Sequence, residues 1–237
     1  MLRITVMNAK GGCGKTTVAT NLASYCSVQG YGTVLFDYDR QASSIRWLKA
    51  RPAGNAAIHG IAAFAPPPKG MTRTWQMQIP QGTQYIIADT PAGYAGIDLK
   101  DRIAESDIIL IPMLPSSIDI HATADFIHEL QTACRTSPGK KIRIGIIANR
   151  ARIHSRNVES LERFIHDQDV PVVSYIRDTS YYVRSTEQGL GVHELPQRGA
   201  LQDRAPWEEI FSWLHQSPDQ VFSVPPPSIS FAMPAGK

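Results

Sequence analysis

The sequence contains little cysteine and no long apolar run. Its three cysteines, Cys13, Cys26 and Cys134, cannot form a full disulfide framework, which favours a reducing, cytoplasmic compartment. No hydrophobic stretch approaches the ~20 residues needed to span a bilayer, so the sequence excludes an integral membrane protein. Only 19% of the 237 residues are charged and 43% are hydrophobic, which is typical of a globular core rather than a disordered or coiled-coil chain.

The net charge is also small, but it is unevenly placed. A formal charge of +3 is too small by itself to indicate a nucleic-acid partner. Residues 135–163 carry +6, whereas residues 164–237 carry −4. The basic residues of the first segment, here called the basic cluster, are Arg135, Lys140, Lys141, Arg143, Arg150, Arg152, Arg156 and Arg163. On charge alone, a solvated surface and a nucleic-acid contact explain this cluster equally well.

Short apolar runs alternate with helix-length stretches along most of the chain. The runs are rich in isoleucine and valine, and they span residues 3–7, 33–36, 84–88, 108–112, 142–148 and 172–176. Helices are expected over residues 15–29, 41–50, 99–105, 122–135, 156–168, 181–188 and 206–216. Nearly continuous apolar strands are typical of a parallel sheet that is buried on both faces. The alternation therefore predicts an α/β fold with a doubly wound, mostly parallel sheet flanked by helices.

Two segments do not follow this alternation. Residues 51–83 contain three consecutive prolines and are interpreted as a variable excursion from the fold. Residues 217–237 contain five prolines and few charges, so we expect an extended or disordered tail. The predicted organisation is one domain over residues 1–216, followed by that tail.

The strongest motif is a glycine-rich loop between the first strand and the first helix. Glycines allow a tight turn in which successive backbone N–H groups converge on phosphate oxygens, and the helix N-terminus adds its positive dipole end. Lys15 would reach the β- and γ-phosphates, and the Thr16 hydroxyl would bind Mg²⁺. The predicted nucleotide-binding residues of the loop are Gly11, Gly12, Cys13, Gly14, Lys15, Thr16 and Thr17. Cys13 occupies a free position of the motif, where we expect an inert small residue.

The loop departs from the ordinary phosphate-loop pattern at its start. Ala9 stands where a glycine is usual, and Lys10 adds a second lysine. The segment resembles the deviant Walker A box, KGGxGKTT, of the ParA/MinD family of P-loop ATPases. This resemblance implies ATP and Mg²⁺ as cofactors, a homodimer formed with ATP, and catalytic functions for Lys10 and Lys15. In that family the early lysine reaches the partner subunit's ATP; the alternative for Lys10 is an ordinary surface lysine.

Two aspartates follow the second expected strand, at the edge where ligands bind in open α/β sheets. The segment Asp37-Tyr38-Asp39-Arg40 resembles the D-x-D-P motif of the family's switch I, with Arg40 in place of proline. The resemblance implies that Asp39 orients the attacking water and that Asp37 supports the Mg²⁺ shell. The alternative is a pair of helix-capping aspartates. Because Arg40 leaves φ free where proline would fix it, the loop geometry is not set by the motif.

Two further polar residues end later strands. Asp89 follows an apolar strand, as in a Walker B segment whose carboxylate holds Mg²⁺ through water, and Gly93 gives the following switch-II-like loop conformational freedom. Asn149 stands where the family reads adenine, and an amide can both donate to and accept from a purine edge. The alternative for Asn149 is an ordinary turn after a strand.

The branches of this family differ in what they bind. The proline-rich tail lacks the basic amphipathic helix of MinD-like members. An iron–sulfur carrier would need a C-x-x-C pair, and the sequence contains none. The remaining ParA-like branch holds the nucleoid through sequence-independent contacts of Arg and Lys with DNA. Arg177 and Arg184 match basic positions of a ParA segment that ends in G-x-x-V. The predicted DNA-binding residues are Arg152, Arg156, Arg177 and Arg184.

The resemblance thus implies a cytoplasmic, nucleoid-associated ATPase that positions or segregates a cargo. An adaptor of the ParB or McdB kind would stimulate hydrolysis, and no membrane partner is expected. The chain is similar in size and motifs to McdA-type ATPases, which space carboxysomes along the nucleoid, and plasmid partition is the close alternative. Two other classes stay open: a MinD-like membrane-associated regulator, and a metabolic P-loop enzyme of the dethiobiotin-synthetase kind.

Overall fold

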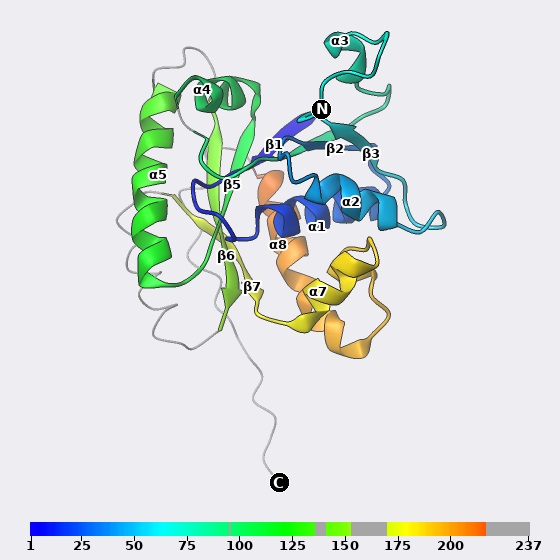
Figure 1. Ribbon diagram of the computed structural model, residues 1–237. Coiled ribbons are helices and arrows are strands. Elements are labelled where there is room, and N and C mark those ends of the chain that lie inside the picture. Colours follow the sequence, from blue (N-terminus) through cyan, green and yellow to red (C-terminus); the bar gives the residue numbers. More distant parts are fainter. Residues whose placement is uncertain (95, 136–140, 153–169, 217–237) are drawn as a thin grey trace.

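Seven strands form one sheet in the order β3-β2-β4-β1-β5-β6-β7, and every pairing is parallel (Figure 1). The computed structural model describes residues 1–94, 96–135, 141–152 and 170–216. The strands are β1 (Leu2–Val6), β2 (Thr33–Asp37), β3 (His59–Ala62), β4 (Tyr85–Asp89), β5 (Ile108–Met113), β6 (Arg143–Ala151) and β7 (Val172–Arg177). The predicted α/β fold with a doubly wound, parallel sheet is confirmed.

Helices cover both faces of the sheet (Figure 1). The α-helices are α1 (Lys15–Val28), α2 (Ser43–Ala50), α3 (Arg73–Gln76), α4 (Gly96–Glu105), α5 (Ser117–Arg135), α7 (Ser180–Glu187) and α8 (Ala205–Leu214). Two short 3₁₀ helices, η1 (Val192–Glu194) and η2 (Arg198–Asp203), lie between α7 and α8. One apolar core joins β1 with α1 and α8, and another joins β5 with α4 and α5. Among the described helices, none combines the length and hydropathy that crossing a bilayer requires.

The excursion over residues 51–83 contains an element that the sequence pattern did not predict. β3 pairs with β2 and forms one edge of the sheet. It has only four residues, of which His59 and Gly60 are exposed, so it lacks the apolar run that marks the central strands. The short helix α3 follows, and the Thr72 side chain accepts a hydrogen bond from the Trp75 N–H at its start. The predicted helix over residues 156–168 and the predicted tail over residues 217–237 lie outside the described residues.

One member of the basic cluster has a structural function. The Arg143 guanidinium donates to the carbonyl oxygens of Trp213, Leu214 and Gln216 at the end of α8, and its Cζ lies 4.2 Å from the centre of the Trp213 ring. A cation at a helix C-terminus satisfies carbonyl groups that have no partner within the helix. Arg143 therefore fixes α8 to the sheet instead of presenting its charge to solvent.

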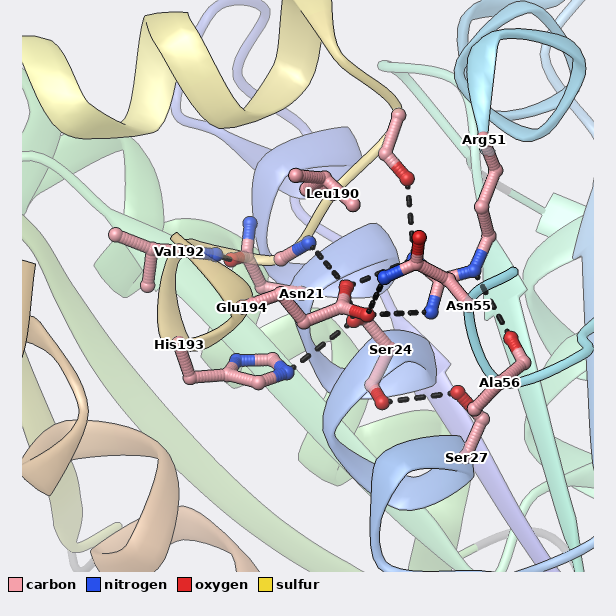
Figure 2. A network of polar contacts seen from close by, with 12 residues as sticks. Asn21, Ser24, Ser27, Arg51, Asn55, Ala56, Leu190, Val192, His193 and Glu194 are labelled. Atoms are coloured by element: carbon pink, nitrogen blue, oxygen red, sulfur yellow. Dashed lines mark hydrogen bonds and ion pairs between the residues drawn. The ribbon is translucent and has the colours of Figure 1, made fainter. Parts of the chain in front are cut away.

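A buried ion pair connects the C-terminal half of α1, the C-terminal end of α2 and η1 (Figure 2). Arg51 donates to both carboxylate oxygens of Glu194 at 2.8 and 2.7 Å, and both side chains are 6% exposed. Glu194 also accepts hydrogen bonds from the Ser24 hydroxyl, Asn55 Nδ2 and the Gly191 N–H. Since these residues come from α1, the end of α2 and η1, the pair fixes the position of α2 relative to α1.

Candidate functional site

The glycine-rich loop connects β1 with α1 at the carboxyl edge of the sheet. Gly12 and Gly14 adopt φ values of +74° and +97°, which favour glycine. A Cβ atom on Gly14 would lie 2.0 Å from Asn149 Nδ2, so this position excludes side chains for a second reason. Asn149 in turn donates from Nδ2 to the Cys13 carbonyl oxygen at 2.8 Å. A hydrogen bond therefore connects the loop to the end of β6.

Lys15 lies inside this loop. Its ammonium donates to the carbonyl oxygens of Lys10 at 2.8 Å and Asn8 at 3.2 Å, and the residue is 7% exposed. A buried cation bordered by carbonyl groups favours an anion at the loop, as a phosphate site requires. Cys13 is buried, and burial raises the pKa of its thiol, so it stays protonated as an inert residue would.

Asp89, at the end of β4, is a carboxylate of the site whose pKa lies well above its ordinary value. Its Oδ2 accepts hydrogen bonds from the Thr16 hydroxyl at 2.8 Å and the Ser44 hydroxyl at 2.6 Å. Its Oδ1 is buried and has no hydrogen-bond partner within the part of the chain that the structure describes. Burial raises the pKa of Asp89 to about 6, against the opposing effect of the two hydroxyls. A buried carboxylate oxygen without a partner, next to a threonine hydroxyl, fits the oxygen ligands that Mg²⁺ prefers.

Ser44 is a site residue that the motifs did not identify. It is fully buried in the first turn of α2, and it shares the same oxygen of Asp89 with Thr16. The only signal in the sequence is its place at the start of the helix that follows Asp37 and Asp39. Ser44 therefore joins α2 to the residues expected to hold the metal ion.

Asp37 ends β2 directly opposite Asp89, with which it is in register. It is fully buried; its Oδ1 accepts from the Asp39 N–H and its Oδ2 from the Ile45 N–H, both at 3.0 Å. Burial raises the pKa of Asp37, while these N–H groups lower it. The carboxylate thus organises the turn into α2, as the capping alternative requires, and its support of the Mg²⁺ shell stays a prediction.

Asp39 lies in the turn between β2 and α2. Its Oδ1 accepts from the Gln41 N–H at 2.9 Å, and the residue is half-buried beside the exposed Arg40. Ala42 completes the turn with a φ of +54°, in the left-handed region that non-glycine residues rarely adopt. The assignment of Asp39 as the residue that orients water stays a prediction.

Lys10 is held by a residue of its own chain. Its Nζ lies 3.4 Å from Asp119 Oδ1, and its side chain is 40% exposed. Asp119 stands in the first turn of α5, where it also accepts a hydrogen bond from the Ser116 hydroxyl. The sequence motifs did not identify Asp119, and the predicted contact of Lys10 with a second subunit stays a prediction.

A cavity of about 260 Å³ lies beside the loop. Thr17 and Asn149 line it together with Asp178, Thr179 and Tyr182, which follow β7. Asn149 also uses its Oδ1 to accept from the Arg150 N–H. The predicted adenine-binding residue thus borders a cavity next to the phosphate loop, although part of its amide is already engaged within the protein.

The expected DNA-binding residues have different surroundings. Arg177 forms a two-point ion pair with the fully buried Asp203, at 3.0 and 2.9 Å. Arg152 is exposed, and its Nη2 lies 3.6 Å from Asp178 Oδ2. Arg184 is exposed and lies over the Tyr181 ring, with its Cζ 5.8 Å from the ring centre. Arg156 lies outside the described residues.

Comparisons with known proteins agree with this geometry. The chain is 26% identical over 198 residues to the maintenance of carboxysome distribution protein A of Halothiobacillus neapolitanus, covering 83% of this chain and 88% of the relative. The fold is similar to that of apo McdA from Cyanothece, with a TM-score of 0.70 at 18% identity, over 90% of this chain and 99% of that structure. It is also similar to the MinD cell division protein of Aquifex aeolicus, with a TM-score of 0.67 at 16% identity, over 92% of this chain and 98% of that structure.

A family-level match covers most of the described fold. It extends over residues 4–192, from β1 and the glycine-rich loop to η1. The match therefore includes Lys15, Asp89 and the cavity beside Asn149 in one unit. On this evidence the chain belongs to the CobQ/CobB/MinD/ParA nucleotide-binding domain family.

Proposed function

We propose that this protein is a ParA-type ATPase that positions a cargo in a cycle of ATP binding and hydrolysis. The observation that carries the proposal is the meeting of Lys15, Thr16 and Asp89 at one loop, with a second lysine, Lys10, at the start of that loop. Two lysines at one phosphate loop exceed what nucleotide binding alone needs. The second one suits a reaction in which negative charge builds up on a transferring phosphoryl group.

The residues of the loop have separate tasks in this proposal. The backbone N–H groups of the loop and the Lys15 ammonium bind the phosphates, and Thr16 and Asp89 hold Mg²⁺. The metal ion neutralises phosphate charge and orients the β- and γ-phosphates when it is bound. Asp39 orients the water that attacks the γ-phosphate. Asn149 and the neighbouring cavity receive the adenine.

Lys10 makes the site depend on a second copy of the chain. Its partly exposed ammonium leaves Asp119 and neutralises charge on the nucleotide of the partner subunit. Two exposed apolar side chains, Ile97 on α4 and Ile118 on α5, each 75% exposed, suit burial in such a dimer. ATP would then hold two subunits together, and hydrolysis would release them.

The ATP-bound dimer binds nucleoid DNA without sequence preference, and an adaptor protein bound to the cargo stimulates hydrolysis. The exposed Arg152 and Arg184 are the DNA contacts best supported by the described surface. The relative named for carboxysome distribution favours a protein organelle as cargo, with a plasmid or chromosome as the alternative.

Retention of the protein on DNA tests this proposal. The wild type should bind DNA with ATP and not with ADP, and the binding should weaken steeply as salt is raised, because phosphate contacts release counterions. Lys15→Ala should not bind DNA, and Asp39→Ala should bind and stay bound, since it can bind ATP but not hydrolyse it. Equal binding with ATP and ADP would contradict the proposal.

A further inference from the structure

Tyr38 is the residue between the two aspartates of the β2–α2 turn, and its surroundings distinguish it from a spacer. Its N–H donates to the Asp89 carbonyl oxygen at 2.9 Å, which continues the pairing of β2 with β4 beyond the last residue of the strand. Its ring stacks on Phe36, with the ring centres 6.0 Å apart and the planes 13° apart. Tyr38 thus sits on the sheet face, and Asp39 is the next residue along the chain.

Arg102 holds the ring of Tyr38. Its Cζ lies 4.2 Å from the ring centre, and its side chain is 14% exposed. A guanidinium over an aromatic ring gains more as its exposure to water falls, and the Arg102 side chain is largely buried. Its Nη1 also lies 2.8 Å from Glu105 Oε2, in a half-exposed ion pair one turn further along α4. Burial raises the pKa of Tyr38 and the Arg102 guanidinium opposes that effect, so both groups lie within electrostatic reach.

Arg102 also lies close to the segment that follows Asp89. α4 begins at Gly96, shortly after Asp89, Thr90 and Gly93. Tyr94 of that segment packs against the apolar core around α4, and the Arg102 charge acts on its hydroxyl as it does on that of Tyr38. One guanidinium therefore lies over the ring of the residue before Asp39 and within electrostatic reach of Tyr94 in the loop that follows Asp89.

We propose that Tyr38 and Arg102 form one positioning element, through which α4 holds the β2–α2 turn so that Asp39 lies where it can orient water. This inference rests on the proposed function of Asp39. Neither Tyr38 nor Arg102 needs to touch the nucleotide. The ring transmits the position of α4 to the next residue. Among the described residues, the Asp39 carboxylate is otherwise secured only by its hydrogen bond from the Gln41 N–H.

A cavity next to the ring makes this contact sensitive to truncation. The cavity has a volume of about 290 Å³, and its lining includes Tyr38, Arg102, Glu105, Phe36, Met77 and Ile79. A smaller or aliphatic side chain at position 38 would leave the guanidinium without its ring and widen this space. The turn would then keep the backbone hydrogen bond from position 38 to Asp89 but lose its side-chain contact with α4.

The test separates the positioning of Asp39 from the binding of nucleotide. Tyr38→Leu and Arg102→Gln should each lower kcat about tenfold, because a small displacement of a catalytic group is costly. The affinity for a fluorescent ATP analogue should stay within about twofold, since neither side chain belongs to the phosphate loop. Combining the two substitutions should lower kcat no further than either one alone, because they break the same contact.

Three control variants make the result specific. Tyr38→Phe keeps the ring face and should retain kcat within about twofold. Glu105→Gln removes the ion pair of the same guanidinium without touching Tyr38, and it should also stay near the wild type. If Tyr38→Leu lowers the melting temperature, its lower kcat could reflect unfolding, and Arg102→Lys then provides the test. This variant keeps the positive charge but loses the planar guanidinium over the ring, so its kcat should fall about threefold below that of the wild type.

The outcomes distinguish this inference from the function on which it rests. Wild-type kcat in Tyr38→Leu and Arg102→Gln, additive losses in the double variant, or equal losses of kcat and nucleotide affinity would each overturn the positioning element. Asp39→Ala serves as the reference. If it hydrolyses ATP at the wild-type rate, the assignment of Asp39 fails; if it is inactive while Tyr38→Leu is fully active, only the positioning element fails.

Discussion

The Lys10 ammonium and the Asp119 carboxylate form an ion pair within one subunit, with 3.4 Å between Nζ and Oδ1. If Lys10 must reach a partner's nucleotide, this pair competes with dimer formation. Lys10→Ala should therefore abolish the ATP-dependent dimer. Asp119→Asn should lower the ATP concentration at half-maximal dimerisation by about two- to fivefold, since a partly exposed ion pair contributes up to about 1 kcal/mol. Light scattering over an ATP titration measures both effects, and a Lys10→Ala dimer of wild-type stability would contradict the prediction.

Gly14 and Gly11 offer a matched pair of substitutions in one loop. Gly14 has a φ of +97°, and a methyl group on it would lie 2.0 Å from Asn149 Nδ2. Gly11 has an ordinary φ, and no atom of the described residues lies within 4 Å of where its own methyl group would be. Gly14→Ala should lower the free energy of unfolding of the nucleotide-free protein by about 1–3 kcal/mol, through backbone strain and displacement of Asn149. Gly11→Ala should change it by less than about 0.5 kcal/mol. Urea denaturation compares the two, and equal losses would refute the stated cause.

The nucleotide loop could be predicted from the sequence because its residues are contiguous and their spacing follows from the shape of a phosphate group. The sheet could be predicted because its central strands are buried on both faces and so read as apolar runs. β3 was not predicted, because an edge strand that is exposed on one side lacks a continuous apolar run. Its assignment depends on pairing with β2, which no local pattern reveals.

The contacts that complete the site could not be predicted, since each joins residues that are far apart in the sequence. Ser44 meets Asp89 and Asp119 meets Lys10 only after the strands have been placed side by side. Arg177 shows the same limit for surface charge. The motif did not predict that the buried Asp203 is its ion-pair partner, and its contact with DNA stays a prediction.

Arg177 and Arg184 should therefore respond differently to truncation. Arg177→Ala leaves the buried Asp203 carboxylate without its partner, which should lower the free energy of unfolding by more than about 2 kcal/mol. Arg184→Ala removes an exposed side chain and should change that free energy by less than about 0.5 kcal/mol. If Arg184 contacts DNA, its loss should weaken DNA retention and reduce the salt dependence while the melting temperature is unchanged. Unaltered DNA retention in Arg184→Ala would remove it from the proposed DNA-binding surface.

The polar network of Figure 2 should make the fold sensitive to acid through His193. Burial lowers the pKa of His193 to about 4, from an ordinary value of 6.5. The unfolded chain therefore binds more protons than the folded protein between pH 6.5 and 4, and stability is lost as pH falls through that window. Glu194 adds a second loss of stability in acid. Burial opposes its ionisation, but the hydrogen bonds from Arg51 and Ser24 outweigh burial and hold its pKa at about 2. The stability that ionised Glu194 contributes therefore declines as the pH falls below 4.5.

His193→Gln isolates the first of these effects. The difference in unfolding free energy between pH 7 and pH 4.5 should be smaller in this variant than in the wild type by on the order of 2 kcal/mol. The comparison is made between variants because Asp89, whose pKa is raised, contributes the opposite slope over the lower part of this range. Urea denaturation at several pH values measures it, and parallel pH profiles for the two proteins would refute the prediction.

Asp89 should show a conflict between stability and function. Because its pKa is raised to about 6, the folded protein holds a proton that the unfolded chain has released between pH 4 and 6, and ionised Asp89 reduces stability above that range. Asp89→Asn keeps an oxygen for Thr16 and Ser44 but removes the buried charge. At pH 7 and without nucleotide, it should unfold with a free energy higher by on the order of 1 kcal/mol. The same variant should lose Mg²⁺-dependent ATP hydrolysis, since the oxygen expected to hold the metal ion is replaced by an amide.

In the wild type, raising the pH from 5 to 7 should strengthen Mg²⁺-ATP binding, because Asp89 is then already ionised. Fewer protons should be released on binding at the higher pH, which calorimetry in buffers of different ionisation enthalpy detects. An Asp89→Asn protein that is less stable than the wild type at pH 7 would show that the buried carboxylate is stabilising, contrary to this account.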